Sequence, residues 1–311
     1  MADGRMKHPA ILSLGEVLWD LFPDGERFGG APANFACHAA IQGADVTMLS
    51  AVGDDQHGRD GINILSAYGI DVSLMQVISE TPTGTVGVKV DDAGKPTFMI
   101  HPGSAWDNIT WNDAIASRIA AVDAIYFGTL GQRDPVSRAT IREAVETAAL
   151  AGIPRILDVN LRAPFFDAEM IRNSVQLASI LKLSDDELVE VCSACSISKT
   201  DQPEGDLRVL LEFGNLDMVI LTFGKDGAVL VTPDDTVTQN GISTNVIDTV
   251  GAGDSLTAAF LVGELRGDPH DKNLRKSCEV AAATCAHSGA LPETSVDCSS
   301  NNGTPDCGGL T

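Results

Sequence analysis

Apolar and polar positions follow one another along this chain in a regular succession of short apolar runs and longer amphipathic stretches. The runs AIYFG, RILDVN, ILKLS and DMVILTFG predict buried strands, and PVSRATIREAVETAALAG, DAEMIRNSVQLA and DDELVEVCSA between them predict helices. Upstream, residues 10–22 read as one mostly apolar strand and DVTMLSAVG as another. Between them, GGAPANFACHAAIQGA reads as a loop and a helix that begins near Pro32 and ends at Gly43. Strands that alternate with helices indicate an α/β fold with a parallel sheet covered on both faces.

Some stretches depart from this alternation. TVGVKVDDAGKPTFMI has two extended runs around DDAG, which predicts a hairpin outside the main sheet. Later, AVLVTPDD and TVTQNG predict an antiparallel pair, and GDSLTAAFLVGELRG and LRKSCEVAAATCAHSG predict two helices. Residues 294–311 are polar and rich in glycine, so we expect a disordered tail after a folded region of residues 1–293.

Charge and hydropathy narrow the classes of partner. The 311 residues carry a formal net charge of −22, which opposes binding to nucleic acid. The charge does not oppose binding to a single nucleotide, because a nest of amides with Mg²⁺ holds phosphates on an acidic protein. No apolar run approaches the length of a membrane span, and the N-terminus lacks a signal-peptide core. We therefore expect a cytoplasmic protein without membrane contact.

The cysteines and histidines give little sign of metal or redox chemistry. Seven scattered cysteines do not make a disulfide framework. Cys192 and Cys195 form one C-x-x-C pair. It could be a structural zinc site or a redox site, or simply two semi-buried thiols without such a function. We favour the thiols because a second pair is lacking. The six histidines lack the spacing of a metal site.

The stretch DTVGAGDSLTAAF contains the strongest candidate chemistry. Gly251 and Gly253 leave the backbone bare before a predicted helix over 254–266, whose first amides and positive dipole end suit an anion. Asp254 would repel a resting phosphate, but it makes sense as the general base for a hydroxyl that attacks the phosphate. The alternative is an N-cap on a glycine turn. A dinucleotide fingerprint fits less well, because Leu256 stands where its third glycine belongs.

Three further sets of polar residues could bind a polyol or could have only a structural role. In GGAPANF, two glycines permit a close approach and Asn34 brings a donor and an acceptor to a helix start, unless this is a plain glycine turn. Asp20, inside the apolar run VLWDLF, either faces solvent at a strand end or accepts hydrogen bonds from a hydroxylated ligand. Asp158, Asn160 and Arg162 follow a buried strand, where α/β sheets bind their ligands.

Two more motifs concern phosphate and nucleotide. In LKLSDDEL, Ser184 ends a strand and Glu187 lies in the next helical turn, where it either influences Mg²⁺ through water or favours the helix dipole. In TFGKDGAVL, Thr222, Gly224 and Gly227 mark a tight corner between strands, which either lines a nucleotide or is a simple turn.

Taken together, these motifs resemble the ribokinase-like (PfkB-type) carbohydrate kinase family. The segment over residues 29–58 is similar to the first signature of that family, and DTVGAGDSLTAAF is similar to the second. The resemblance covers about residues 10–293. It implies a central, mostly parallel sheet with helices on both faces and a small β-sheet lid from two segments, near 16–34 and 82–106. Such a lid explains the hairpin that interrupts the alternation.

The resemblance also implies roles for individual residues. Asp254 corresponds to the catalytic base. The other correspondences are an anion hole at Gly251, Ala252 and Gly253, sugar contacts at Asp20, Gly30, Asn34 and Arg162, phosphate and Mg²⁺ contacts at Ser184 and Glu187, and a nucleotide corner at Thr222, Gly224 and Gly227. We add Asn160 to the sugar contacts because it follows the same strand as Arg162. Ser184 departs from the asparagine that the family usually has at that position.

The cofactors that the resemblance implies are ATP and Mg²⁺, with K⁺ as a further candidate. Asp248 and Val250 match positions that hold a monovalent cation, together with backbone groups near Thr284, His287 and Gly289. Glu293 replaces the small hydroxyl residue that is usual in this cation site.

The motifs GEVLWDLFP, AWD and DVNLRAPF look most like the fructokinase branch. The predicted activity is therefore phosphorylation of the 6-hydroxyl of D-fructose by ATP. The alternatives are a kinase for ribose, ketodeoxygluconate or another sugar, a non-catalytic sugar sensor of the same fold, and a nicotinamide oxidoreductase. Trp19, Phe28 and Phe98 in the predicted lid need cover, which predicts a homodimer through the lid.

Overall fold

A large sheet forms the centre of the protein. The structure is a computed structural model and describes residues 8–90 and 96–292. Within these residues the main sheet has nine strands, in the order β13 (Thr236–Asn240), β12 (Gly227–Val231), β11 (Met218–Thr222), β10 (Ile180–Ser184), β9 (Arg155–Asp158), β8 (Ala124–Gly128), β1 (Ala10–Leu14), β4 (Asp45–Gly53) and β5 (Asp71–Ile78). Neighbouring strands from β11 to β5 pair parallel. At the other edge, β12 pairs antiparallel with both β11 and β13. The predicted mostly parallel sheet and its antiparallel edge pair are confirmed.

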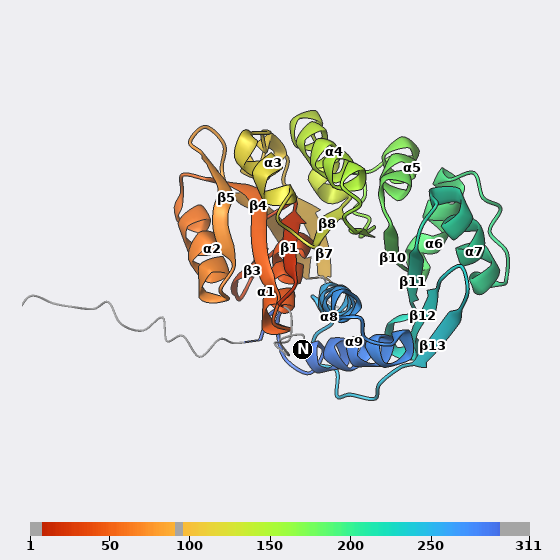
Figure 1. Cartoon of the computed structure of the whole chain (residues 1–311). Helices are drawn as coiled ribbons and strands as arrows, with labels where there is room; N and C mark the ends of the chain where they lie inside the picture. Colours follow the sequence, from red (N-terminus) through yellow and green to blue (C-terminus); the bar gives the residue numbers. More distant parts are fainter. Residues whose placement is uncertain (1–7, 91–95, 293–311) are drawn as a thin grey trace, which may run out of the picture.

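Helices cover both faces of the main sheet (Figure 1). One face carries α3 (Asp113–Ile119), α4 (Pro135–Leu150), α5 (Ala168–Leu177), α6 (Asp185–Ala194) and α7 (Pro203–Gly214). The other carries α1 (Ala31–Ile41), α2 (Gln56–Ala67), α8 (Ala252–Arg266) and α9 (His270–Thr284). Along β1, Leu12 and Leu14 belong to the first core and Ile11 to the second. Because the central strands are buried on both faces, they read as continuous apolar runs, whereas the edge strands β5 and β13 are largely not buried.

Residues 10–22 form two strands, so the prediction of one strand was wrong. The chain leaves the main sheet after β1, bends at Gly15, whose φ is 139°, and enters β2 (Leu18–Phe22). A Cβ on Gly15 would lie 2.7 Å from the Pro32 ring, so a side chain here would clash with α1. Hydropathy did not reveal the break because Leu14 before it and Val17 and Leu18 after it are apolar and buried, with Glu16 as the one charge between them.

The second strand belongs to a separate, smaller sheet. Within the described residues this sheet has four strands in the order β3 (Gly25–Gly29), β2, β6 (Gly84–Val90) and β7 (Pro96–Ile100). The strands β6 and β7 pair antiparallel, as the hairpin prediction requires, although the turn between them lies outside the described residues. We call these four strands the lid sheet. The predicted tail, residues 294–311, also lies outside the description.

Trp19 and Phe28 of the lid sheet pack against α2 of the same chain. Trp19 Nε1 donates to the backbone oxygen of His57 on α2 at 3.0 Å, and the Trp19 and Phe28 rings meet edge to face at 5.8 Å. Phe28 also packs against Gly61 of α2, since a Cβ there would lie 3.4 Å from its ring. The side chain of Phe98 lies outside the description. The homodimer therefore stays a prediction, without support from Trp19 and Phe28.

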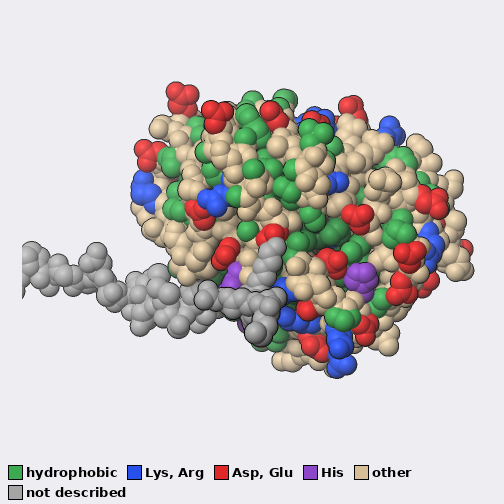
Figure 2. Space-filling view, in the orientation of Figure 1, with side chains coloured by type: hydrophobic (Ala, Val, Ile, Leu, Met, Phe, Trp, Pro, Cys, Tyr) green, Lys and Arg blue, Asp and Glu red, His purple; other side chains and the backbone are tan. Residues whose placement is uncertain are grey.

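The surface charge, the helices and two buried thiols can be compared with the expectations about charge, membrane contact and the C-x-x-C pair. Figure 2 shows acidic side chains spread over the face in view, as the charge of −22 leads one to expect. Among the described residues, no helix has both the length and the apolar character needed to cross a membrane. Cys192 and Cys195 are buried free thiols at the end of α6, and burial raises the pKa of each to about 11. These two residues therefore act as packing side chains.

Candidate active site

The glycine-rich loop forms the N-terminus of α8. Gly251 is the N-cap residue in the left-handed conformation, with φ 78°, and a Cβ there would lie 2.8 Å from Ala290. Both the backbone conformation and the close contact therefore require glycine. Residues 251–254 are each partly exposed. The first amides of a helix have no intrahelical partner, so this turn presents donors and a positive dipole end to an anion.

Asp254 contacts Asn34 from the other end of the sequence. Asn34 Nδ2 donates to Asp254 Oδ2 at 2.9 Å, and Asn34, in α1, is 5% exposed. Burial raises the pKa of Asp254 above its ordinary value, while the Asn34 hydrogen bond and the charges of Lys182 and Arg162 oppose this shift. A carboxylate with a raised pKa, held in one orientation at an anion site, is suited to accept a proton. The predicted sugar contact thus holds the predicted base.

Lys182 is a site residue that the sequence analysis missed. Its Nζ lies 3.0 and 3.1 Å from the carboxylate oxygens of Asp158, and Thr257 Oγ1 donates to the same carboxylate at 3.1 Å. The Lys182 and Asp158 side chains are 8% and 1% exposed. Burial raises the pKa of Asp158 to about 6 against the opposing charge of Lys182. A lysine in the middle of the apolar run ILKLS was the available signal.

The ion pair lies directly behind the glycine-rich loop. A Cβ on Gly253 would be 3.0 Å from Lys182 Nζ, so the ammonium group occupies the space that a side chain at Gly253 would need. Negative charge that develops on a phosphoryl group at this loop would therefore face the helix N-terminus and a fixed, buried cation together.

A pocket of about 630 Å³ adjoins the loop on the side of β11 and β12. The predicted corner residues Thr222, Gly224 and Gly227 line one part of it, and Ala252 of the loop lines another. Residues between 241 and 249, with side chains of α9, complete the walls. Its volume and its continuity with the anion-binding turn fit a nucleotide whose phosphates extend toward Asp254. The fold also requires glycine at position 227, since a Cβ there would lie 2.0 Å from Gln239 O on β13.

Ser184 and Glu187 form a capping box at the start of α6. The backbone nitrogen and Oγ of Ser184 both donate to Glu187 Oε2 at 2.8 Å, and the Leu161 amide donates to Oε1 at 2.7 Å. Glu187 therefore also holds the loop after β9. Within the described residues, no group of three or more His, Cys, Asp or Glu side chains could hold a metal ion. Mg²⁺ would fit here with nucleotide phosphates and water as its ligands and Glu187 behind a water.

Asp248 joins the loop before α8 to the end of the described chain. Its oxygens accept hydrogen bonds from the amides of Val250 at 3.1 Å and Gly289 at 2.9 Å. Burial opposes ionisation of Asp248, but these amide bonds prevail and lower its pKa. The structure thus brings Asp248, Val250 and Gly289 together. The Asp248 amide also donates a hydrogen bond to the Cys285 carbonyl at 3.3 Å, in the turn before His287. Glu293 lies outside the described residues.

The predicted sugar contacts Asp20 and Arg162 are charged side chains that are not paired with each other among the described contacts. Asp20, on β2, is half-buried, and burial raises its pKa to about 6 against the charges of Arg162 and Arg27. Arg162 is exposed, and its Nη1 donates to the neighbouring Leu161 carbonyl at 3.0 Å. Its charge also acts on Asp254. Asn160 has φ 42°, a left-handed conformation that asparagine adopts more readily than most residues and that recurs at functional sites.

Gly30 has a structural role that the sequence analysis did not foresee. It is the N-cap residue of α1, with φ 107°, and a Cβ there would lie 2.5 Å from the backbone oxygen of Glu16. The absent side chain is therefore needed for two stretches of backbone to meet. Gly30 as a sugar contact stays a prediction.

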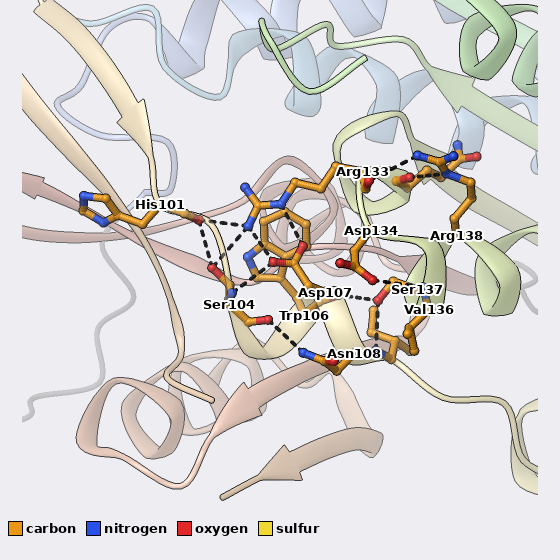
Figure 3. Close-up of polar contacts among 12 residues, drawn as sticks. His101, Ser104, Trp106, Asp107, Asn108, Arg133, Asp134, Val136, Ser137 and Arg138 are labelled. Atoms are coloured by element: carbon orange, nitrogen blue, oxygen red, sulfur yellow. Dashed lines mark hydrogen bonds and ion pairs between the residues drawn. The ribbon is translucent and has the colours of Figure 1, made fainter. Parts of the chain in front are cut away.

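A second polar cluster fixes the lid sheet to the main sheet (Figure 3). Arg133 Nε and Nη2 each lie 2.7 Å from an oxygen of Asp107, and Nη2 donates to the His101 carbonyl at 2.9 Å. The guanidinium also lies 3.9 Å from the Trp106 ring centre and 4.8 Å from that of Phe165. Arg133 thereby joins the segment after β7 to the loop after β9. A pocket of about 320 Å³ beside it includes none of the predicted site residues.

Comparison with known proteins identifies the family of this chain. The family model described as "pfkB family carbohydrate kinase" matches residues 23–295. The chain is similar to an ATP-dependent 6-phosphofructokinase of Thermoanaerobacterium thermosaccharolyticum, 25% identical over 90% of this chain and 89% of the relative. It is also similar to a probable fructokinase-5 of Arabidopsis thaliana, 27% identical over 82% of each chain.

A solved structure has the same architecture. The structure of a Pyrococcus horikoshii sugar kinase in complex with ATP is 28% identical, with a TM-score of 0.78 over 90% of this chain and 93% of that one. The ribokinase-like fold, with its large mostly parallel sheet and separate small sheet, is therefore confirmed. Because the family model matches most of the length of this chain, the chain belongs to the pfkB family of carbohydrate kinases.

Proposed function

We propose that this protein transfers the γ-phosphoryl group of ATP to a primary hydroxyl of a sugar, with the 6-hydroxyl of D-fructose as the preferred acceptor. One observation carries the proposal: Asp254, held by Asn34, lies in the first turn of α8, and Ala252 of the same turn lines the 630 Å³ pocket. A general base at an anion-binding turn is the arrangement that attack of a hydroxyl on a phosphoryl group needs.

In the proposed reaction, Asp254 accepts the proton of the attacking hydroxyl, which is typically worth ~10²–10⁴ in rate. The amides of Gly251, Ala252 and Gly253 donate to the phosphoryl oxygens, and Lys182 adds positive charge behind them. Mg²⁺ bound with ATP would neutralise part of the phosphate charge, with Glu187 behind its water ligands. Thr222, Gly224 and Gly227 line the proposed nucleotide pocket, and Ser184 is a proposed phosphate contact.

Asp20, Asn160 and Arg162 are the proposed sugar contacts. A carboxylate and a guanidinium group bind hydroxyls through charge-assisted hydrogen bonds, which are stronger than neutral ones. The lid sheet carries Asp20 above the site, where it would exclude water from the transferring phosphoryl group. Fructose is preferred because the chain resembles fructokinases in GEVLWDLFP, AWD and DVNLRAPF and is similar to a probable fructokinase.

The experiment is a measurement of ADP release with ATP, Mg²⁺ and a panel of acceptors: D-fructose, D-ribose, ketodeoxygluconate and fructose 6-phosphate. We expect the highest kcat/KM with D-fructose. A higher value with another acceptor would replace fructose and keep the kinase assignment. Saturable sugar binding without ADP release from any acceptor would instead indicate a sugar sensor.

The same assay tests the proposed monovalent cation. Asp248, fixed by the amides of Val250 and Gly289, is the proposed ligand for K⁺ beside the anion-binding turn. We expect ADP release to fall when K⁺ is replaced by tetramethylammonium at equal ionic strength. Equal rates in both salts would contradict the cation site.

A further inference from the structure

Arg133 is a buried arginine for which neither the sequence motifs nor the proposed reaction gives a role. It lies just before α4, and its side chain is 6% exposed. Its Nε and Nη2 each lie 2.7 Å from a carboxylate oxygen of Asp107, which is itself 5% exposed. Nη2 also donates to the His101 carbonyl, directly after β7 (Figure 3). A bidentate pair of this kind fixes the plane of the guanidinium group as well as its position.

The guanidinium group also lies over aromatic rings from two different elements. Arg133 Cζ is 3.9 Å from the centre of the Trp106 ring and 4.8 Å from the centre of the Phe165 ring. A cation this close to an aromatic ring is attracted by its electron-rich face, more strongly where water is excluded. Nη1 has no hydrogen-bond partner in the described part of the chain, so the group is held by the two rings, Asp107 and His101.

The first ring leads to Asp20 on the lid sheet. Trp106 is fully buried, and a Cβ on Gly84, the first residue of β6, would lie 2.4 Å from its Nε1. The indole therefore packs directly on the start of β6. Gly84 is paired with Leu18 of β2, and Asp20 follows two residues later on that strand. Arg133 thus reaches the strand that carries Asp20 through one ring and one strand pairing.

The second ring leads to Arg162. Phe165 belongs to the loop after β9, and its amide donates to the Arg162 carbonyl at 2.8 Å, so both residues lie in one turn. At the start of this loop, the Leu161 amide donates to Glu187 at 2.7 Å. The backbone of Arg162 therefore lies between two anchors, Glu187 on one side and the contact of Arg133 with Phe165 on the other.

We propose that Arg133 is a positioning residue for the acceptor: it fixes the spacing between Asp20 on the lid sheet and Arg162 on the loop after β9. In this role Arg133 does not touch the sugar, and its effect passes through Trp106 and Phe165. Burial raises the pKa of Asp20 and the Arg162 charge opposes this shift, as expected of two side chains that face one site.

This role concerns binding of the sugar rather than binding of the nucleotide. Asp20 and Arg162 are not bonded to each other among the described contacts, so their spacing depends on the elements that carry them. Groups that bind a ligand together lose affinity when their spacing changes. The glycine-rich loop and the 630 Å³ pocket include none of the residues that contact the Arg133 guanidinium group. The KM for the sugar should therefore respond to Arg133, and the KM for ATP should not.

The test is the kinetics of Arg133→Lys with ATP, Mg²⁺ and the best acceptor of the panel. Lysine keeps a positive charge beside Asp107, but a single ammonium group cannot make the bidentate pair or lie flat on a ring. We expect the KM for the sugar to rise roughly tenfold, with the KM for ATP unchanged and a smaller effect on kcat. A folded Arg133→Lys enzyme with the wild-type KM for the sugar, or with equal rises in both KM values, overturns the proposal.

Arg155→Lys is the matched control. Arg155 is a half-buried arginine that begins β9, at the opposite end of the strand from the loop, and it donates to the carbonyls of Leu177 and Ile153 at 2.8 Å. Its replacement should lower the melting temperature and leave the KM for the sugar unchanged. If Arg155→Lys raises this KM as much as Arg133→Lys does, Arg133 merely stabilises the fold and the proposal is overturned.

Phe165→Leu decides the question if Arg133→Lys does not fold. Phe165 is only partly buried, so this variant removes the contact with the guanidinium group at little cost to folding. We expect a two- to fivefold rise in the KM for the sugar. Phe166→Leu, in the same loop, should leave it unchanged, because the described ring contacts of Arg133 do not include Phe166. A wild-type KM in Phe165→Leu overturns the proposal.

A double variant tests whether the effect passes through Arg162. If it does, Arg133→Lys should raise the KM for the sugar by a smaller factor in an Arg162→Ala enzyme than in the wild type. Equal factors in the two backgrounds overturn the proposal. The inference rests on the proposed kinase function. Absence of ADP release from the wild-type protein contradicts that function, whereas normal turnover with an unchanged KM for the sugar in Arg133→Lys contradicts only the role of Arg133.

Discussion

The two sides of Asp254 are built differently. On the phosphoryl side, the polar groups bind one another: Lys182 is paired with Asp158, Thr257 donates to the same carboxylate, and Glu187 accepts hydrogen bonds from Ser184 and Leu161. On the acceptor side, Arg162 is exposed and donates only to its neighbour's carbonyl among the described contacts, and Asp20 is a half-buried carboxylate.

This difference separates the chemistry from the choice of substrate. A network of buried, mutually bonded groups is preorganised for one reaction and does not depend on which alcohol attacks. Separated charges on a loop and on a second sheet can be completed by any of several polyols. The family and the reaction are therefore easier to infer from this chain than the sugar.

The largest expected effect comes from removing the base. Asp254→Asn keeps the shape and the contact to Asn34 but cannot accept the hydroxyl proton, so kcat should fall by ~10²–10⁴. ATP binding, followed by calorimetry, should persist. Turnover close to that of the wild type would show that Asp254 is only an acidic residue of the first turn of α8, and it would contradict the proposed division of the site.

The next effect tests whether the phosphoryl side is held by its buried ion pair. Lys182→Met leaves the Asp158 carboxylate without its cation, and breaking a buried pair costs about 3–5 kcal/mol of unfolding free energy. Chemical denaturation measures this loss. The matched control is Arg275→Met, which breaks the exposed pair with Glu279 and should cost about 0.5 kcal/mol or less. Equal losses in the two variants would contradict the buried network.

On the acceptor side, Arg162→Ala should act on the sugar alone. Loss of a hydrogen bond to a charged group costs about 1.5–3 kcal/mol, which corresponds to roughly a 10- to 100-fold rise in the KM for the sugar. The KM for ATP should not change. Arg138→Ala, beside the separate 320 Å³ pocket, serves as the control and should leave the KM for the sugar as it is. The reverse result would move the acceptor site to that pocket.

The smallest effect is a pH dependence. Burial raises the pKa of Asp20 to about 6, so the carboxylate is ionised above that pH and becomes protonated as the pH falls through it. Protonated Asp20 is a poorer acceptor for sugar hydroxyls, so kcat/KM for the sugar should fall up to about tenfold per pH unit below 6. In Asp20→Asn this part of the pH dependence should vanish. An identical profile in the variant would remove Asp20 from the sugar contacts.

The sequence predicted the elements whose pattern is strong and local. DVTMLSAVG forms β4 over the predicted residues, and ILKLS forms β10. Residues 10–22 were assigned to one strand because a change from one sheet to another leaves no mark in hydropathy. No prediction was made for β5, α3 or α7, and β3 was covered only by the lid segment near 16–34 that the family resemblance implies. The sequence GERFG of β3 has two glycines and two charges in five residues, and that composition does not indicate a strand.

The candidate site was predicted in its residue types but not in its contacts. Asn34 and Asp254 are 220 positions apart, and no periodicity in the sequence links them. Lys182 was missed because it stands alone in an apolar run, where only the folded structure shows what it faces. The argument that singled out Asp20 applied to Lys182 as well, since both are charges in segments that must be buried.

Gly30 shows how far a signature motif can be trusted as a sign of activity. Its missing side chain is required by the contact with the Glu16 backbone, whatever is bound nearby. A descendant of this chain that had lost all turnover would still keep Gly30 in order to fold, while Asp254 would be free to drift. If Asp254 is the base, as proposed, it is the position of the second motif expected to separate active members of this family from inactive copies, whereas Gly30 and Gly251 are required by the fold in both.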